Sequence, residues 1–220
     1  MALLIEIGRM RPNAGHCSAT GTAPVRTVQL ERRVEPVRQH SPRQCWASVL
    51  EMGCAHLGGS MAQGDYAQAV DRARAWDRGE DVHGYMLLHE LLGAWWFPLR
   101  PATAESNEEV MVLRPLQLGR GPRSLVAALE NDRPVAVVST TTLPEGERAG
   151  HMWLLTSARV EGQDDAARLI SVSGIDPWHG RPTELSCSDF AATTTVAMEM
   201  TTSDRSTETA RRREFERRHR

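Results

Sequence analysis

The sequence contains no lysine, and all 26 of its basic residues are arginine. A coding preference for arginine explains this without any function, because composition alone is weak support for one. The alternative is that a chain without lysine offers no side chain for ubiquitin attachment. Acidic residues nearly balance the arginines, and the formal net charge is only -2. Composition therefore predicts neither a nucleic-acid partner nor an anionic membrane surface.

Long hydrophobic runs are absent as well. No stretch approaches the roughly 20 apolar residues of a membrane span. The start, MALLIEIGRM, has an apolar run that Glu6 interrupts and no basic residue ahead of it, which argues against a secretory signal peptide. We therefore expect a protein that is cytoplasmic, or that leaves its cell without a classical signal, including delivery into a target cell.

Cysteine is scarce, with Cys17, Cys45, Cys54 and Cys187 the only four in the chain. They form no CxxC pair, so neither a zinc knuckle nor a redox motif is indicated, and we expect no metal and no cofactor. Nine residues separate Cys45 from Cys54, which would place them on opposite faces of one helix, about 13 Å apart along its axis. Bridged Cα atoms must lie within about 7 Å, so this pair is excluded and a reduced protein is expected.

The chain is long enough, at 220 residues, for one domain or for two small lobes that share a cleft. Residues 1–24 show no periodicity and predict a flexible leader. Residues 203–220 predict a charged tail that is either a solvated helix or a disordered end. The domain itself is expected over residues 25–202.

The first half of this domain predicts helices. After an extended segment over residues 25–37, Ser41-Pro42-Arg43-Gln44 has the form of a capping box, with a serine N-cap, a proline at the first helical position and a glutamine three residues on. The helix that it opens should end at Gly58-Gly59. Further helical patterns open at Asp65 and near Asp81.

The second half predicts a sheet. A short helix is expected over residues 124–131, and strands over 134–139, 151–160, 168–174 and 193–200. We therefore expect an α+β protein in which an N-terminal helical lobe packs against a C-terminal antiparallel β lobe, with a cleft between them.

Cys45 is the first candidate for chemistry, because it lies in the first turn of the predicted helix. Unpaired backbone N–H groups there carry about half a positive charge, which favours the thiolate. With a protonated histidine close by, such a site lowers a cysteine pKa from about 8.5 to between about 3.5 and 7.5. A cysteine at a helix start is more often packed than reactive, so the assignment depends on partners.

His151 and Asp176 are the candidate partners. His151 follows Gly150 at the start of an apolar strand. His16 and His219 fall in flexible ends, and His56, His83 and His89 fall on helices where a surface or capping role is ordinary. His40 is close to Cys45 in sequence, but the direction of its side chain is left open. Asp176 ends the next strand, 25 residues later, so its carboxylate could hold the other nitrogen of the imidazole. Taken alone, Asp176-Pro177-Trp178 is more typical of a simple turn after a strand.

Together these segments resemble a known family. Gln39-x5-Cys45-Trp46-Ala47, a Gly150-His151 strand and Asp176-Pro177-Trp178 are similar to the motifs of papain-like cysteine peptidases, especially the small bacterial effector peptidases of plant pathogens. The resemblance implies a two-lobed papain-like fold whose central helix begins at the nucleophile Cys45. It also implies that His151 is the base, that Asp176 orients it, and that Gln39 donates its side-chain amide to the oxyanion hole.

The resemblance spans about residues 25–200 and is specific in three short segments. It departs from the family in two ways. The interval from Cys45 to His151 is 106 residues, shorter than the roughly 130 to 150 of plant and lysosomal members. Arg43-Gln44 also replaces the usual Gly-Ser before the cysteine, so the walls of the cleft should differ.

The expected function is therefore that of a cysteine endopeptidase acting on a protein or peptide substrate, as a bacterial effector or toxin. Two alternatives remain open. The same triad could serve another acyl transfer, such as deamidation, transglutamination or leader-peptide processing. The chain could also be an inactive binding module that keeps the cleft. Neither the oligomeric state nor the side chains that the cleft prefers can be predicted.

Overall fold

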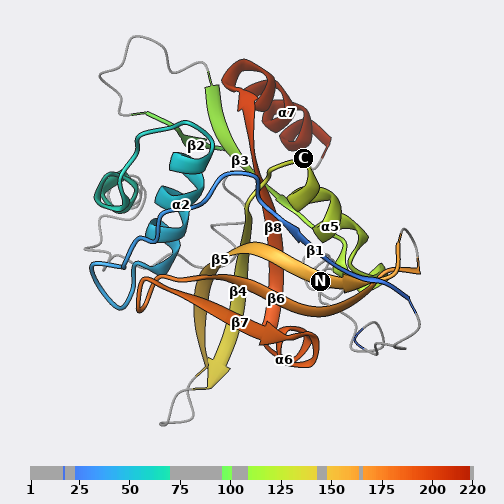
Figure 1. Cartoon of the computed structure of the whole chain (residues 1–220). Coiled ribbons are helices and arrows are strands. Elements are labelled where there is room, and N and C mark those ends of the chain that lie inside the picture. Colours follow the sequence, from blue (N-terminus) through green and yellow to red (C-terminus); the bar gives the residue numbers. More distant parts are fainter. Residues whose placement is uncertain are drawn as a thin grey trace.

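The computed structural model describes Cys17 and residues 23–69, 96–100, 109–142, 148–163 and 166–218. These residues are organised around one curved antiparallel sheet with helices on both of its faces (Figure 1). The sheet has eight strands in the order β2-β3-β8-β4-β5-β6-β7, and β1 pairs with β5. The combination of helices and an antiparallel sheet confirms the α+β class.

The strands are β1 (Val25–Gln29), β2 (Phe97–Pro98), β3 (Glu109–Pro115), β4 (Val135–Thr142), β5 (Arg148–Glu161), β6 (Arg168–Asp176), β7 (Arg181–Ser186) and β8 (Thr194–Asp204). The helices are α2 (Cys45–His56), the short 3-10 helix η2 (Leu118–Arg120), α5 (Arg123–Glu130), α6 (Cys187–Thr193) and α7 (Arg205–Arg218), and residues 63–69 are also helical.

Most of the predicted elements of the second half are confirmed. The four expected strands correspond to β4, β5, β6 and β8, and the short helix to α5. Four elements of this half were not predicted: β3, η2, β7 and α6. The apolar run of β3 is short, and such runs cannot be told from buried helix by periodicity. Strand β7 alternates exposed and half-buried residues and α6 has seven residues, so neither has a strong pattern.

The first half is less purely helical than predicted. The extended segment over residues 25–37 is a strand only in β1, where it joins the sheet beside β5. Strand β2 also belongs to this half. The helix expected from Asp65 begins two residues earlier, at Gln63. The helix expected near Asp81 lies outside the described residues.

Both faces of the central strands are buried. In β5, Met152 and Leu154 belong to the core under α2, while Trp153 and Leu155 belong to the core on the opposite face. Side chains alternate between the faces of a sheet, so a strand covered on both sides has a continuous apolar run rather than an alternating one. This explains the sequence of β5 and fixes the strand that carries His151.

Helix α2 lies directly on the sheet because its packing face is apolar and closely fitted. Nine of its 12 residues are buried. Gly53 faces β8 so closely that a Cβ atom there would lie 2.4 Å from Met200 Sδ. A larger residue at this position would force the end of the Met200 side chain to move and would change the packing between α2 and β8.

The predicted capping box at Ser41 is wrong. Helix α2 begins at Cys45, its N-cap is Gln44, and no side chain caps it. The Ser41 carbonyl instead accepts the Gln44 backbone N–H at 3.1 Å, closing a turn over residues 41–44. Local hydrogen bonds of this kind compete with helix formation. Cys45 therefore lies in the first turn, as predicted, but as the first helical residue, three residues nearer the helix start than a cap at Ser41 implies.

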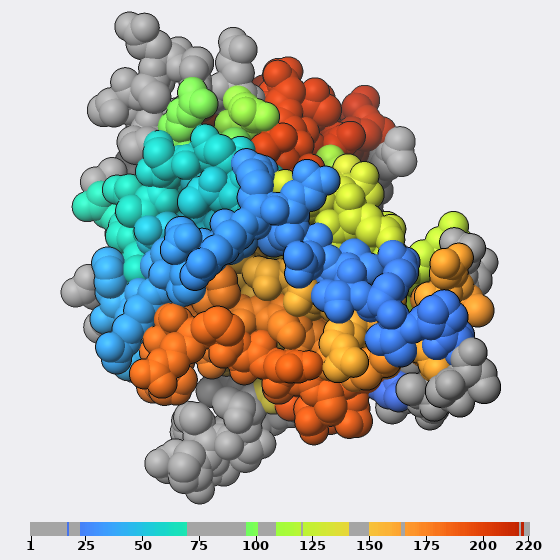
Figure 2. Space-filling view, viewed as in Figure 1, coloured from blue at the N-terminus to red at the C-terminus, as the bar shows by residue number. Residues whose placement is uncertain are grey.

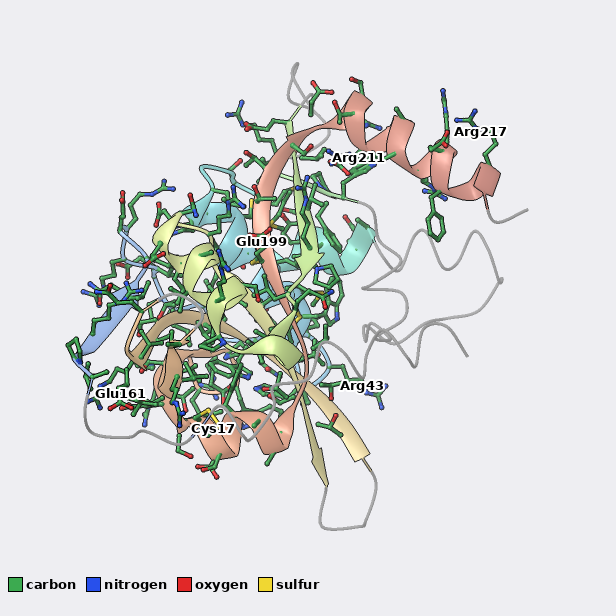
Figure 3. The ribbon with its side chains drawn as sticks, turned by 90° about the vertical axis from the view of Figure 1, so that its right-hand side faces the viewer. Cys17, Arg43, Glu161, Glu199, Arg211 and Arg217 are labelled. Carbon is green, nitrogen blue, oxygen red and sulfur yellow. A yellow bond between two sulfur atoms is a disulfide. The ribbon has the colours of Figure 1, made fainter. Side chains whose placement is uncertain are left out.

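A disulfide joins Cys17 to Cys187 across 170 residues of sequence, with 5.3 Å between their Cα atoms (Figure 3). This corrects the expectation of a fully reduced protein. The pairing depends on the position of α6 against the sheet, which spacing along the chain does not reveal. Cys45 and Cys54 are free, as their predicted separation requires.

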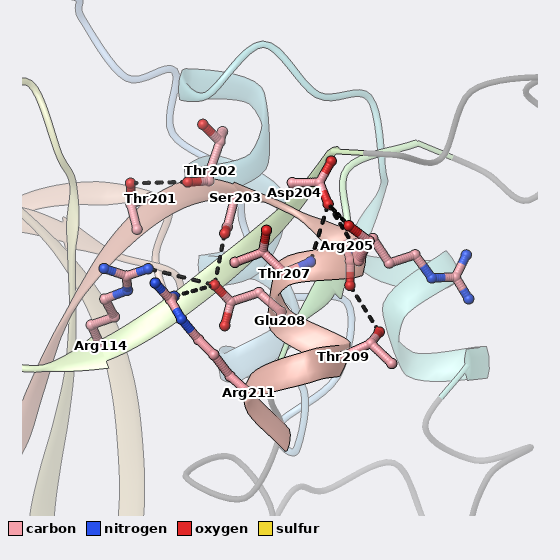
Figure 4. Close-up of polar contacts among 11 residues, drawn as sticks. Arg114, Thr201, Thr202, Ser203, Asp204, Arg205, Thr207, Glu208, Thr209 and Arg211 are labelled. Atoms are coloured by element: carbon pink, nitrogen blue, oxygen red, sulfur yellow. Dashed lines mark hydrogen bonds and ion pairs between the residues drawn. The ribbon is translucent and has the colours of Figure 1, made fainter. Parts of the chain in front are cut away.

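The C-terminal residues form helix α7, the helical alternative predicted for the charged tail. A buried carboxylate attaches this helix to the sheet (Figure 4). Glu208 is only 3% exposed, accepts a hydrogen bond from Ser203 Oγ at 2.7 Å, and pairs with Arg114 and Arg211. Among the described residues, no helix is both long and apolar enough to cross a membrane.

Candidate active site

Cys45 stands at the N-terminus of α2, half-buried and not bonded to another cysteine. The first N–H groups of a helix have no partner within it, and their dipoles favour a negative charge. No acidic side chain occupies the first turn of α2 to oppose that effect. The Cys45 backbone N–H therefore lies outside the helical hydrogen-bond pattern.

His151 comes from β5 and Asp176 from the end of β6. Their side chains meet, with His151 Nε2 2.8 Å from Asp176 Oδ1. Both side chains are partly open to solvent, at 26% and 30% exposed. The imidazole also hydrogen-bonds the Cys45 side chain. Because Nε2 is engaged by the carboxylate, Nδ1 is the ring nitrogen available to the sulfur.

The electrostatics of the three groups favour a charged imidazole. Burial lowers the pKa of His151, but the hydrogen bonds and negative charges of Asp176 and Cys45 outweigh it and raise that pKa to about 9. Burial likewise raises the pKa of Asp176, yet hydrogen bonds from His151 and from the Trp178 backbone, with the charges of His151 and His179, hold it below its usual value. His151 is therefore protonated at neutral pH beside an ionised carboxylate.

The turn after β6 holds Asp176 in place. The Trp178 backbone N–H donates to Asp176 Oδ1 at 2.8 Å, so the Asp-Pro-Trp segment is a turn as well as an orienting element. The indole of Trp178 is 45% exposed. What this residue clearly contributes is its backbone N–H, which fixes the carboxylate that in turn fixes the imidazole.

Gln39 lies ahead of α2, half-buried, with its amide held by a local hydrogen bond. Its Nε2 donates to the Ser41 carbonyl at 2.7 Å. Its Oε1 is buried and has no hydrogen-bond partner among the described residues. A primary amide has two N–H donors, so one remains available after the bond to Ser41. That second N–H is the group an oxyanion hole would use.

The segment before α2 is attached to the turn after Asp176, which brings the two parts of the site into one framework. The Gln39 backbone N–H donates to the Pro177 carbonyl at 2.8 Å. Gly180, with a φ of +59°, lies so close that a Cβ atom there would be 3.2 Å from Arg38 Cβ. Figure 2 shows the residues before α2, in blue, lying against the orange turn between β6 and β7.

Arg43, one of the two residues that replace the usual Gly-Ser, is exposed and projects away from the ribbon (Figure 3). Gln44, which precedes the nucleophile, is half-buried and acts as the N-cap through its backbone. Of the two glutamines, Gln39 is the one whose backbone is attached to the turn after Asp176.

Two buried polar residues were not predicted from the sequence, one beside this site and one at the other end of helix α2. Gln63 is only 2% exposed and bonds the backbone on both sides of Gln39. His56, expected at the surface, is buried at the far end of α2 and binds Asp132. A lone glutamine and a histidine at a helix end have no sequence pattern that signals burial, so only the packing around them could reveal these contacts.

The described residues contain no cluster of three or more His, Cys, Asp or Glu side chains that could hold a metal ion. The chemistry that they offer is that of a thiol, an imidazole and a carboxylate. In comparisons with known proteins, the chain matches no family model and no curated protein.

Proposed function

We propose that this protein is a cysteine peptidase of the papain-like type, with Cys45 as nucleophile, His151 as general acid and base, and Asp176 as the residue that orients the imidazole. The observation that carries the proposal is the convergence of three side chains from α2, β5 and β6: His151 bonds both Asp176 and Cys45. A nucleophile, a base and an orienting group in this order are the requirement for covalent acyl transfer.

The elements that carry the three side chains, one helix and two strands, support the same proposal. The nucleophile opens a helix that packs on the sheet, and the base and the carboxylate come from neighbouring strands of that sheet. This is the arrangement implied by the resemblance to papain-like peptidases. Gln39 and the Cys45 backbone N–H are the two donors that would stabilise an oxyanion beside the sulfur.

The reaction follows from these roles. The Cys45 thiolate adds to the carbonyl carbon of a peptide bond, and the carbonyl oxygen becomes an oxyanion. Protonated His151 gives its proton to the leaving amine as the C–N bond breaks, which leaves a thioester on Cys45. Neutral His151 then accepts a proton from water while the water oxygen attacks the thioester. The carboxylic acid departs, and thiolate and imidazolium are restored.

The test uses casein as a general substrate. Wild-type protein should release peptides, and the Cys45→Ala variant should release none, because no other group in the site can form the thioester. Equal cleavage by both proteins would contradict the proposal. Mass spectrometry of the treated casein adds a second criterion, since shortened chains indicate hydrolysis of peptide bonds whereas a changed mass of the intact chain indicates another acyl transfer.

Labelling separates an active enzyme from an inactive binding module. A papain-type epoxide inhibitor should modify Cys45 at neutral pH, because this half-buried thiol is beside the protonated His151 imidazole. Cys54 is the internal control: it is buried, its Sγ contacts the Leu99 carbonyl at 3.3 Å, and burial raises its pKa. Modification of Cys54 in preference to Cys45 would contradict an activated nucleophile.

A further inference from the structure

We propose that Gln63 is a positioning residue that holds Gln39, and with it the second oxyanion donor, in register with the nucleophile helix. The inference rests on the proposed function, because it assigns a role in stabilising the oxyanion. It concerns a residue that lies in another helical segment, outside every motif of the site.

The side chain of Gln63 hydrogen-bonds the residues on both sides of Gln39. Its Oε1 accepts the His40 backbone N–H at 3.0 Å, and its Nε2 donates to the Arg38 carbonyl at 3.0 Å. In extended backbone, the carbonyl of one residue and the N–H of the residue two further on point to the same side. Gln63 therefore pairs with this short segment as a neighbouring strand would.

The opposite side of the same segment is held as well. The Gln39 backbone N–H points the other way and donates to the Pro177 carbonyl at 2.8 Å. Gln39 is thus fixed between a buried amide on one side and the Asp176 turn on the other. With its backbone held on two sides, its side-chain amide has little freedom to move relative to Asp176.

Gln63 also ties this segment to the nucleophile helix. Its Oε1 accepts a second hydrogen bond, from Ser48 Oγ at 3.0 Å, and Ser48 lies one turn after Cys45 in α2. Its backbone N–H donates to Glu51 Oε2 at 2.8 Å, in the next turn of the same helix. The Gln63 side-chain amide therefore connects the segment that contains Gln39 with helix α2, which carries the Cys45 sulfur.

The chemistry of this position requires glutamine. An amide offers acceptor lone pairs on one atom and N–H donors on the other, which is what Arg38, His40 and Ser48 need together. A glutamate keeps the acceptors but loses the donor. An alanine leaves a buried carbonyl, a backbone N–H and a hydroxyl without their partner, and buried unpaired polar groups are destabilising. With Gln63 only 2% exposed, water cannot replace it freely.

Two reactions of the same thiol test the role. p-Nitrophenyl acetate acylates Cys45: the thiolate adds to the carbonyl, an oxyanion forms, and its collapse releases p-nitrophenolate and leaves an acetyl thioester. Iodoacetamide alkylates Cys45 by displacing iodide, and no oxyanion forms. The ratio of the two rates reports oxyanion stabilisation alone, because loss of folded protein or of thiolate lowers both rates together.

In Gln63→Ala, acylation should fall about tenfold or more while alkylation stays within about twofold, since removal of one oxyanion donor outright costs about 10²–10³. Gln63→Glu, which keeps the size and the acceptors, should lower the ratio in the same direction by a smaller factor. The matched control is Gln117→Ala, which removes an exposed glutamine whose side chain caps nothing and should leave the ratio unchanged.

A double-mutant cycle separates positioning from a merely structural role. In a Gln39→Ala background, the further change Gln63→Ala should not lower the ratio again, because residues that act as a unit are not additive. An equal fall of both rates in Gln63→Ala, an unchanged ratio, or additive effects in the cycle would overturn the inference and leave the proposed function standing. Equal acylation of wild type and Cys45→Ala would overturn both.

Discussion

Helix α2 has a histidine–aspartate pair near each end, and the two pairs differ in what surrounds them. Near Cys45, His151 Nε2 lies 2.8 Å from Asp176 Oδ1, and the ring is partly exposed. At the other end, His56 Nε2 lies 3.0 Å from both Oδ1 and the backbone oxygen of Asp132, and its side chain is fully buried. The same residue types at similar distances therefore stand in two different environments.

The two pairs also differ in the partner of the second ring nitrogen of each histidine. His151 has one nitrogen left for the Cys45 thiol, whereas His56 Nδ1 is buried without a partner in the described part of the chain. Asp132 is also occupied by the Glu31 backbone N–H and by Arg32. One pair can pass a proton to a reacting group and the other only joins α2 to the segment after α5. Exposure and neighbours decide the role, not the pair itself.

The largest effect should come from His151→Ala. Removing the general acid and base should lower the rate of casein cleavage by about a thousandfold or more, as loss of a triad member does elsewhere. The free energy of unfolding at neutral pH should fall only modestly, because both side chains of the pair are partly exposed to solvent. Rates are measured on purified protein and stability by urea unfolding. If His151→Ala retains more than a tenth of the wild-type rate of casein cleavage, the two histidine–aspartate pairs do not differ in their importance for activity.

His56→Ala should produce the opposite pattern. The change removes two hydrogen bonds to Asp132 and leaves a cavity under α2, so we expect a loss of about 2–4 kcal/mol in the free energy of unfolding. Activity per folded molecule should stay close to that of wild type, because no atom of His56 faces the sulfur. Urea unfolding gives the free energy of unfolding. The rate of casein cleavage divided by the concentration of active Cys45, counted by labelling, gives the activity per folded molecule. A large loss of activity in fully folded protein would assign His56 to the site.

Asp132→Asn tests how much the His56–Asp132 pair contributes to the stability of the fold. Burial raises the pKa of Asp132, but hydrogen bonds from the Glu31 backbone and Arg32, with the charge of His56, hold it below its usual value. A depressed pKa contributes stability that is present above about pH 3.9 and is lost as the pH falls through the folded value. The variant should therefore lose about 1–3 kcal/mol at neutral pH, and its stability should fall less steeply in acid. An unchanged acid profile would contradict this.

Asp176→Asn should have a smaller and different effect, on activity and its pH dependence. Asparagine can still accept a hydrogen bond from His151 but brings no charge, so we expect a fall in rate of about tenfold at neutral pH. In wild type the rate of Cys45 acylation should decline with a midpoint near pH 9, where His151 loses its proton. In the variant this midpoint should move to lower pH. A midpoint that does not move would show that the carboxylate does not act through the imidazole.

The smallest effect concerns stability in alkali. The folded pKa of His151 lies near 9 and that of an unfolded histidine near 6.5, so folding favours the protonated form. Its contribution is fully present below about pH 6.5 and is lost as the pH rises to about 9. Urea unfolding of wild type should weaken over this range, and His151→Ala should show less of this weakening. Identical slopes for the two proteins would contradict the raised pKa.

Much of the fold followed from local pattern. The continuous apolar run of β5 and the apolar stripe of α2 predict elements that the structure contains, because periodicity reflects which faces are buried. The start of α2 was misplaced, because the Ser41 carbonyl is used in a turn that a capping pattern does not reveal. Helix α6 was missed because seven residues carry too short a pattern.

The candidate site divides in the same way. Cys45, His151 and Asp176 were selected from the resemblance to papain-like peptidases together with their residue types and order in the chain, although His151 lies inside β5 and not at its start. Gln63 and the Cys17–Cys187 disulfide could not, because nothing near them in sequence marks their partners.

By itself the sequence determined the class of fold, most of the strands and the order of the reactive residues, since these depend on interactions between near neighbours in the chain. Only the tertiary structure decided that His151 and not His56 lies beside a thiol, that Gln63 holds the residues around Gln39, and that Cys17 meets Cys187. The physical reason is that these contacts join residues far apart in sequence. Their formation depends on how α2 packs on the sheet and on the order and register of its strands, which local pattern does not specify.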